Sequence, residues 1–344
     1  MIMKFAIVGA GVAGSFLACA LSQKGNDVEV FEWYPKEQHF PVCAWGASRH
    51  MLSHFSQMVG LNFDDYIFHV GDKMGVYLPN GKSDSLKLLG LVTYDKQKWE
   101  RDMLDGINVN YGVRCTSNNF PFHKYDYVLD CTGFHRSLLP KPEEKELVIP
   151  AWEYIVDGVS DLNEFYIIGY KRAMGYFWFF PLNDGRGYVG AGDMNRVYFG
   201  ISEFFKERPH ARVLGKIGRP IRITPPTRMR PFTSNNVIGV GESIGCVFPL
   251  LGEGIIPSLI CSEILVDLFN DNEFSGEEYA KRVLKRMGYY DDVYRMIRLK
   301  MSGSLNTVKH FKLLYNIYRK MKKEEKRFGF EISLEKLVRL LNSL

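Results

Sequence analysis

The stretch Lys4-Phe-Ala-Ile-Val-Gly9-Ala-Gly11-Val-Ala-Gly14 decides the fold of the chain. It has the pattern of a buried strand followed by a G-x-G-x-x-G turn, and an apolar, helix-like run continues to about Leu21. A second strand-like run, Val28-Glu-Val-Phe-Glu32, closes the unit on an acid. This order predicts the β-α-β unit of a dinucleotide-binding fold. The alternative is a glycine-rich turn in some other α/β unit.

Each glycine of the turn has a physical role. Gly9 permits the tight turn, Gly11 lets the backbone approach a pyrophosphate, and Gly14 lets the helix pack against the sheet. The helix N-terminus offers unpaired N–H groups and partial positive charge to the phosphates. Glu32, 18 residues after Gly14, is placed to accept hydrogen bonds from a ribose. We therefore expect a bound dinucleotide at this turn.

Composition is that of an ordinary globular protein of 344 residues, with 46% hydrophobic and 24% charged residues. Six cysteines lack C-x-x-C or zinc-ligand spacing, so we expect reduced thiols, and the histidines predict no metal site. The apolar N-terminus is already the first strand, which argues against a signal peptide, and acids and Pro257 interrupt the longest apolar run, 247–269. These features predict a cytoplasmic protein.

Positive charge is concentrated at the C-terminal end. Residues 281–344 carry 17 Lys+Arg and 6 Asp+Glu, a net charge of +11, whereas residues 1–280 carry 27 and 33, a net charge of −6. The pattern predicts amphipathic helices with basic faces, for example over residues 311–323. Such faces are either simply solvated or attracted to anionic lipid headgroups or a lipid phosphate at a membrane surface. With no recognition motif beside the charge, nucleic acid is not an expected partner.

The order of segments predicts an α/β fold with an α+β insert, in which a Rossmann-type FAD-binding domain is interrupted by an antiparallel-sheet substrate domain. We expect a helix over 48–59, a hairpin within 66–92, and a strand over 236–242 that returns to the nucleotide fold before a helix over 255–269. The predicted FAD-binding domain comprises residues 1–60, 93–146 and 233–275, and the substrate domain comprises 61–92 and 147–232. Residues 276–344 form a basic C-terminal helical tail.

Three distant segments favour FAD over NAD. Beside the N-terminal fingerprint, Asp130-Cys-Thr-Gly133 resembles the strand-end turn that many flavoproteins place beside the cofactor. The segment 239–255, with Gly241-Glu242 and then Pro249-Leu-Leu-Gly-Glu-Gly-Ile, resembles the G-D motif of the para-hydroxybenzoate hydroxylase-like superfamily. In that superfamily an acid holds the ribityl hydroxyls and a helix N-terminus stabilises the anionic reduced flavin. Glu242 replaces the usual Asp, which moves the acceptor by about 1.5 Å.

Two further motifs narrow the resemblance. Tyr176-Phe-Trp-Phe-Phe-Pro181, followed by Gly190-Ala-Gly192, resembles the Y-x-W-x-F-P…G-x-G signature of the geranylgeranyl reductases. The segment 40–46, Phe-Pro-Val-Cys-Ala-Trp-Gly, resembles their P-x-x-C-G loop, with two residues inserted between Cys43 and Gly46. The resemblance covers roughly residues 1–270 and implies the reduction of isolated C=C bonds in a polyprenyl chain.

The resemblance and the motifs together predict the site. Tyr176, Trp178 and Phe180 alternate on a strand and are expected to line a tunnel for the chain, unless they only pack a core. Cys43 is the candidate catalytic residue, which either orients substrate, donates a proton, modulates the flavin or only packs against it. The expected cofactor-binding residues are Gly9, Gly11, Val12, Ala13, Gly14, Glu32, Trp33, Lys96, Val113, Thr132, Gly133, Gly241, Glu242, Pro249, Gly252, Gly254 and Ile255. For Lys96 the alternative is an exposed helix lysine.

The expected protein is an FAD-dependent reductase of a prenyl lipid or an isoprenoid phosphate that makes peripheral membrane contact through its basic tail. The alternatives are an FAD-dependent monooxygenase and a non-catalytic flavoprotein that binds lipid or carries electrons. No second G-x-G-x-x-G argues for a dedicated NAD(P)H domain, so ferredoxin, quinol or diffusing NAD(P)H remain open as the external electron donor.

Overall fold

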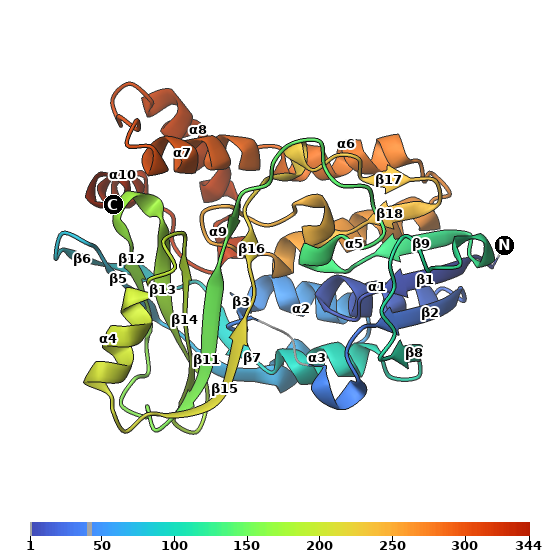
Figure 1. Ribbon diagram of the computed structural model, residues 1–344, viewed down its shortest axis with the longest axis horizontal. Coiled ribbons are helices and arrows are strands. Elements are labelled where there is room, and N and C mark those ends of the chain that lie inside the picture. The colour runs from blue at the N-terminus through green and yellow to red at the C-terminus, as the bar shows by residue number, and fades with distance from the viewer. Residues whose placement is uncertain (1, 40–42) are drawn as a thin grey trace.

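The computed structural model describes residues 2–39 and 43–344 and places two large sheets beside each other (Figure 1). One is a six-stranded sheet in the order β17-β18-β9-β1-β2-β8, parallel except for its edge strand β17. Its strands are β1 (Lys4–Val8), β2 (Asp27–Glu32), β8 (Asn108–Tyr111), β9 (Tyr127–Asp130), β17 (Thr233–Ser234) and β18 (Val237–Gly239). Helix α1 (Val12–Ser22) packs on this sheet, and α3 (Lys96–Met103) and α5 (Ile255–Asn270) pack against α1.

The first strand is buried in the interior of the fold, where Phe5 packs against Phe269 of α5. Phe5, Ala6 and Ile7 are fully buried, and so are Phe16 and Leu17 of α1. A parallel sheet covered on both faces needs such continuous apolar strands, which explains why the opening stretch is apolar rather than alternating. The carboxyl ends of β1, β2, β9 and β18 therefore meet at one edge, where loops can hold a ligand.

The second sheet has seven strands in the order β15-β11-β14-β13-β12-β5-β6, all antiparallel to their neighbours except for the parallel pair β12–β5. Its strands are β5 (Lys73–Tyr77), β6 (Ser83–Lys87), β11 (Ala151–Asp157), β12 (Phe165–Gly169), β13 (Gly175–Pro181), β14 (Arg186–Asp193) and β15 (Arg212–Gly218). Helix α4 (Phe199–Glu207) packs on its outer face against Phe177 and Phe179. The inner face turns toward the six-stranded sheet.

Smaller elements join the two sheets. A three-stranded sheet contains β3 (Gly46–Ser48), β4 (Ile67–Val70) and β7 (Leu91–Tyr94), and helix α2 (Arg49–Met58) follows β3. The pair β10 (Val148–Ile149) and β16 (Ile221–Arg222) forms a further short ladder.

The C-terminal segment folds back onto the body rather than extending from it. It comprises α6 (Gly276–Met287), α7 (Tyr290–Met301), α8 (Phe311–Lys323), α9 (Glu325–Phe328) and α10 (Leu334–Ser343). Helices α7, α8 and α10 lie beside the end of the seven-stranded sheet in Figure 1. The carbonyl of Leu344 accepts a hydrogen bond from the N–H of Arg172, and Leu88 forms a β-bridge with Phe330.

The predicted fold class is confirmed, with two corrections to the secondary structure. The strand expected over 236–242 is shorter, because β18 ends at Gly239 and Gly241–Ile244 form a 3-10 helix. The hairpin expected within 66–92 is limited to β5 and β6, which join around the turn at Asn80-Gly81. Strands β4 and β7 flank that hairpin but pair with each other in the three-stranded sheet instead. Alternation alone does not reveal which partner a strand chooses, because it shows only which face of the strand is buried. The domain boundaries stay a prediction.

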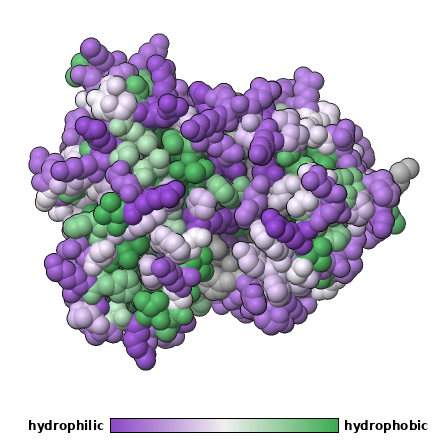
Figure 2. Space-filling view, viewed as in Figure 1, coloured by the Kyte–Doolittle hydropathy of each residue, from purple (hydrophilic) through white to green (hydrophobic). Residues whose placement is uncertain are grey.

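Exposed apolar side chains gather in Figure 2 on the half of the molecule that holds α4 and the seven-stranded sheet. They include Val197 and Phe199 at the start of α4 and Val213 and Leu214 on the edge strand β15, each at least half exposed. Among the described residues, no helix combines the length and the apolar character that crossing a bilayer requires.

Candidate functional site

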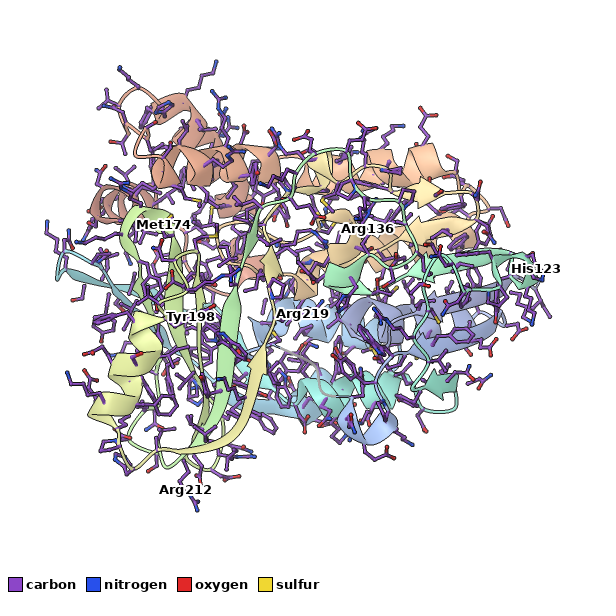
Figure 3. All side chains as sticks on the ribbon, in the orientation of Figure 1. His123, Arg136, Met174, Tyr198, Arg212 and Arg219 are labelled. Atoms are coloured by element: carbon purple, nitrogen blue, oxygen red, sulfur yellow. The ribbon has the colours of Figure 1, made fainter. Side chains whose placement is uncertain are left out.

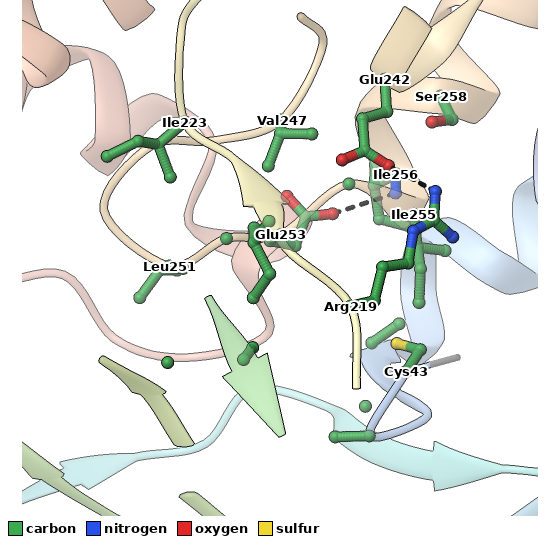
Figure 4. Close-up of a pocket in the computed structure, with 18 of the residues that line it drawn as sticks. Cys43, Arg219, Ile223, Glu242, Val247, Leu251, Glu253, Ile255, Ile256 and Ser258 are labelled. Carbon is green, nitrogen blue, oxygen red and sulfur yellow. Dashed lines mark hydrogen bonds and ion pairs between the residues drawn. The ribbon is translucent and has the colours of Figure 1, made fainter. Parts of the chain in front are cut away.

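A cavity of about 850 Å³ lies between the two sheets and is closed at one end by the C-terminal segment. Its wall includes the loop after β1, the turn after β9, the loop before α5 and the inner face of the seven-stranded sheet. Figure 4 shows the part around the start of α5, where Cys43, Arg219 and Glu242 face a common space.

The glycine turn has the packing that its sequence predicts. Gly9 has a positive φ of 101°, and a Cβ there would lie 2.4 Å from the carbonyl oxygen of Cys131. A Cβ on Gly14 would lie 1.8 Å from the carbonyl oxygen of Gly9. By contrast, a Cβ on Gly11 would meet no atom of residues 2–39 and 43–344 within 4 Å, so these residues leave open space in front of the first turn of α1. Within the same residues no side chain caps that turn, which leaves its N–H groups available to a phosphate.

Glu32 lies at the end of β2 and is buried. Its carboxylate accepts hydrogen bonds from the N–H groups of Ala10 and Tyr34, each at 2.9 Å. These bonds hold the carboxylate at the cavity wall and fix the glycine turn to the end of β2. His39, which the sequence did not single out, lies with Nε2 3.8 Å from Glu32 Oε2.

The turn after β9 is held by Asp130 and by a buried arginine. Oδ1 of Asp130 accepts bonds from the N–H and hydroxyl of Thr132, at 3.1 and 2.6 Å. Arg222, only 2% exposed, donates to the carbonyls of Phe134 (2.8 Å) and Glu242 (2.7 Å). Arg222 therefore ties together the two segments that the sequence assigned separately to the cofactor. Sequence reasoning missed it because nothing in a short strand indicates that its arginine turns inward.

Glu242 reaches the cavity, but Arg219 pairs with it there. Arg219 Nη2 lies 3.1 Å from Glu242 Oε2, and the two side chains face each other in Figure 4. A Cβ on Gly133 would lie 2.7 Å from the same Nη2, so the guanidinium lies across the predicted cofactor turn. Figure 3 places Arg219 between the two sheets. The structure thus adds a cation, Arg219, beside the predicted ribityl-binding acid.

The start of α5 also carries a charge that the motif did not predict. Glu253 Oε1 accepts a hydrogen bond from the N–H of Ile256 at 2.9 Å, and Oε2 pairs with Arg327 of α9 at 2.5 Å. Arg327 is 6% exposed and lies over the ring of Phe328. Burial raises the pKa of Glu253, while Arg327 opposes this rise. The C-terminal segment is thereby joined electrostatically to the cofactor-side helix.

Cys43 and Lys96 lie on the cavity wall in a buried polar environment. Burial raises the pKa of the Cys43 thiol to about 11, and the nearby Lys96 only partly offsets it. Lys96 is 5% exposed and its Nζ lies 2.5 Å from Glu100 Oε1, so the alternative of an exposed helix lysine is wrong. The role of either residue toward a cofactor stays a prediction, and the residues just before Cys43, 40–42 of the predicted loop, lie outside the described residues.

The aromatic strand β13 faces the cavity with alternate residues, as expected. Tyr176, Trp178 and Phe180 line the cavity, and the Tyr176 hydroxyl donates to the carbonyl of Leu251. Trp178 Nε1 donates to Oε2 of Glu153 on β11 at 3.1 Å, across the intervening strand β14. A Cβ on Gly190 of β14 would lie 2.3 Å from the indole. The first glycine of the G-x-G motif therefore provides the space in which the indole crosses the sheet.

All but two of the expected site residues line the cavity. The exceptions are Gly14 and Gly241, which are packing positions: a Cβ on Gly241 would lie 2.4 Å from Ser258 Oγ. Those on the wall are Gly9, Gly11, Val12, Ala13, Glu32, Trp33, Cys43, Lys96, Val113, Thr132, Gly133, Tyr176, Trp178, Phe180, Glu242, Pro249, Gly252, Gly254 and Ile255.

Sequence reasoning missed Glu153 and the C-terminal wall. The signal for Glu153 was present, because it shares a strand face with Ala151 and Ile155 and an acid on an apolar face is unusual. The C-terminal residues on the wall are Ile297, Met321, Arg327, Phe328, Phe330, Glu331, Ile332, Ser333, Lys336, Leu337, Leu340 and Leu344. Their helical pattern shows an apolar face, but not which cavity that face closes.

Comparison with known proteins agrees with this geometry. Residues 7–35, the β1-α1-β2 unit, match the NAD(P)-binding Rossmann-like domain family. Digeranylgeranylglycerophospholipid reductase 2 of Methanopyrus kandleri is 27% identical over 304 residues, which cover 75% of this chain and 74% of that protein. The chain is similar to the geranylgeranyl reductases. The predicted resemblance is therefore confirmed.

Several solved structures share the fold of this chain. A geranylgeranyl bacteriochlorophyll reductase-like protein of Thermoplasma acidophilum has a TM-score of 0.68 at 16% identity, covering 94% of this chain and 98% of that one. A flavin-dependent brominase has a TM-score of 0.66 at 13% identity, covering 99% and 94%. A probable FAD-dependent monooxygenase of Pseudomonas aeruginosa has a TM-score of 0.60 at 14% identity, covering 88% and 99%. The chain therefore shares its fold with flavin-dependent enzymes.

The residues present fit FAD. The open space before Gly11 and the uncapped start of α1 suit a pyrophosphate, Glu32 at the strand end suits a ribose, and Glu242 suits the ribityl chain. The start of α5 lies on the same wall and suits an anionic flavin ring.

Proposed function

We propose that the protein is an FAD-dependent reductase that saturates isolated C=C bonds in a geranylgeranyl or longer prenyl chain of a lipid or isoprenoid phosphate. The observation that supports it best is the continuity of the cavity. One end carries the dinucleotide-binding turn, and the same cavity extends along an aromatic strand to an apolar end. That far end is lined by Met74, Val76, Leu78, Leu86, Ile167, Leu337, Leu340 and Leu344, and the same elements add Asp84, Ser333 and Lys336 to the wall.

An isolated alkene explains why such a cavity is useful. It has no carbonyl to polarise, so catalysis depends on holding the double bond against the hydride donor in a water-excluding space. Reduced FAD supplies that hydride when bound. The aromatic faces of Tyr176 and Trp178 favour positive charge that develops on an alkene carbon. The chain's own contribution is to position the alkene, exclude water and provide the proton.

The similarity to the Methanopyrus kandleri enzyme supports a lipid substrate, since its name describes reduction of a digeranylgeranyl glycerophospholipid. The flavin in this account receives its electrons from an external donor, either ferredoxin or NAD(P)H.

Peripheral membrane contact through the basic tail is part of the proposal. The segment before and at the start of α8 exposes Val308, Phe311 and Tyr315 by 84%, 52% and 42% of their surfaces. Lys309 and Lys312 lie between them in the sequence. Exposed apolar and aromatic side chains interleaved with lysines are typical of segments that bind anionic bilayers.

An anaerobic reoxidation experiment separates the candidate functions. The FAD-loaded protein is reduced with dithionite, excess dithionite is removed, and digeranylgeranyl glycerophospholipid is added while flavin absorbance is followed. Reoxidation with this lipid, and none with the same lipid bearing saturated chains, supports the reductase. A flavin hydroperoxide on admission of air, without anaerobic reoxidation, supports the monooxygenase instead. A reduced protein that responds to neither agrees with the non-catalytic flavoprotein.

A cavity-filling variant tests whether the apolar end holds the chain. Ile167 lies on β12 in register with Trp178 and faces the cavity. Ile167→Trp should slow reoxidation by the long-chain lipid far more than by a short prenyl alcohol such as geraniol. Val213→Trp, which adds the same ring at an exposed position of β15, should leave both rates unchanged. Equal effects of the two variants would argue against this location of the chain.

A further inference from the structure

A buried acid faces the cavity from the middle of the seven-stranded sheet. Glu153 is 5% exposed and lies on β11, in register with Gly190 of β14, which in turn pairs with Trp178 of β13. Its Oε2 accepts the indole N–H of Trp178 at 3.1 Å. Within the part of the chain that the structure describes, Oε1 has no hydrogen-bond partner although it is fully buried. One oxygen is thus fixed and the other is left free beside the cavity.

An unpaired, buried carboxylate oxygen lowers the stability of the fold, so its presence suggests a role in function. A buried, unsatisfied carboxylate oxygen destabilises a fold, and a purely structural site would hold an apolar residue at that position. The cost falls when the carboxyl group is protonated, because a neutral acid loses less hydration on burial. Burial raises the pKa of Glu153 to about 8, opposed by the Trp178 hydrogen bond and by the charge of Lys96. At neutral pH the group therefore holds a proton.

We propose that Glu153 is the general acid of the reaction, and that it delivers its proton from Oε1 to one carbon of the prenyl double bond. This proposal rests on the proposed prenyl reduction. The electron pair of the C=C bond forms the new C–H bond with the Glu153 proton at the less substituted carbon. The other carbon, where positive charge develops, receives the hydride supplied by the reduced flavin. The alkene gains two electrons, the flavin loses two, and Glu153 is left as a carboxylate that takes a proton from water.

The surrounding groups favour Glu153 over the other candidates as the acid. Cys43 on the loop before β3 has a pKa of about 11, so its thiol is the poorer proton donor near neutral pH. Lys96 of α3 forms an ion pair with Glu100, with Nζ 2.5 Å from Oε1, so its ammonium already has a partner. From β14, the hydroxyl of Tyr188 has its pKa raised far above the usual value by burial and by Glu153 itself. Trp178, by donating to Oε2, is a positioning residue that directs Oε1 toward the substrate.

Glu153→Gln is the direct test, because it keeps the shape of the side chain and removes the acidic proton. The control is Glu164→Gln, the same change at a surface position beside the same sheet, where the side chain is 57% exposed. Both proteins are loaded with FAD, reduced with dithionite and mixed anaerobically with digeranylgeranyl glycerophospholipid. Flavin reoxidation is followed by stopped flow between pH 5 and 10. Denaturant unfolding and FAD titration verify that each variant is folded and loaded.

The proposal predicts that Glu153→Gln slows reoxidation by 100-fold or more, the usual contribution of a general acid, while FAD affinity and reduction by dithionite stay unchanged. The wild-type rate should fall above a pKa near 8, and this limb should vanish in Glu153→Gln. Trp178→Phe should move the limb to higher pH, because the lost hydrogen bond favoured the carboxylate. Infrared titration should show a protonated carboxyl band at pH 7 that is absent from Glu153→Gln.

A wild type that reoxidises with the lipid, together with a Glu153→Gln reoxidation rate within three-fold of the Glu164→Gln rate, would overturn the role of Glu153. The prenyl reductase proposal would still hold in that case. An unchanged pH limb in Glu153→Gln, or no protonated carboxyl band at pH 7, would also overturn it. Failure of the wild type to reoxidise with the lipid would overturn the proposed function and the general acid with it.

Discussion

Gly190→Ala is the substitution whose effect the structure defines most closely. The new Cβ would lie 2.3 Å from Cζ2 and 2.4 Å from Cε2 of the Trp178 indole. Carbon atoms in contact prefer about 3.5 to 4.0 Å, so the ring has to move by more than about 1 Å. The indole N–H, now 3.1 Å from Glu153 Oε2, then loses its acceptor.

The magnitude follows from these two effects. Overpacking costs about 1 to 3 kcal/mol, and a lost hydrogen bond to a buried acid costs about 1 to 2 kcal/mol. Replacing a strand glycine by alanine raises the free energy of unfolding by about 0.5 to 1 kcal/mol, because it lowers the conformational entropy of the unfolded chain. These terms sum to a net loss of about 1 to 4.5 kcal/mol in the free energy of unfolding. The matched control is Gly215→Ala on β15, whose Cβ would meet Ile155 at an ordinary 3.6 Å.

Equilibrium urea unfolding of the two variants, followed by near-ultraviolet circular dichroism, provides the assay. The urea midpoint of Gly190→Ala should fall clearly, with a changed tryptophan signal in the native baseline. Gly215→Ala should stay within about 0.5 kcal/mol of the parent protein, as is usual for a substitution away from crowded positions. Equal midpoints for the two variants would refute the reasoning that Gly190 exists to admit the indole.

Further outcomes follow from the cofactor turn and the buried charges. Gly11→Ala should weaken FAD binding at least ten-fold in a fluorescence titration and leave the stability of the apoprotein unchanged. Gly14→Ala should instead destabilise the apoprotein, because its Cβ would lie 1.8 Å from the carbonyl oxygen of Gly9. Arg327→Met should lower the free energy of unfolding in urea by about 3 to 5 kcal/mol, because it leaves Glu253 buried without its cation. Adding Glu253→Gln should recover part of that loss, and a double-mutant cycle measures the recovery. The pKa of Glu153 is raised from 4.5 to about 8, so between these pH values the folded protein retains a proton that the unfolded chain has released. The free energy of unfolding should therefore fall as the pH rises through this window, by up to about 1.4 kcal/mol per pH unit. Glu153→Gln should flatten that slope. An equal slope in both proteins would contradict the buried, protonated acid.

Much of the fold was predictable because the deciding signals are local. The G-x-G-x-x-G turn at 9–14 has one dominant structural meaning when a strand precedes it and a helix follows it. Likewise, alternation on β13 correctly predicts that Tyr176, Trp178 and Phe180 face the cavity, while Phe177 and Phe179 face α4.

The remaining features depend on contacts between distant segments. Nothing local to Arg327 indicates that it pairs with Glu253, 74 residues earlier, and nothing near Gly190 shows that an indole crosses above it. The pairing of Arg219 with Glu242 likewise depends on how a loop of the second sheet reaches the first. Tertiary packing decides such contacts, so sequence patterns identify the participants without their partners.

The mass of the lipid product tests the central claim most directly. The FAD-loaded protein is reduced with dithionite and incubated with digeranylgeranyl glycerophospholipid in matched anaerobic and aerobic samples. The lipid is then extracted and its molecular mass is measured by mass spectrometry. The account predicts anaerobic products heavier by two hydrogens for each double bond saturated, in step with flavin reoxidation. A lipid that remains unchanged without oxygen, or that gains an oxygen atom only in air, would contradict it.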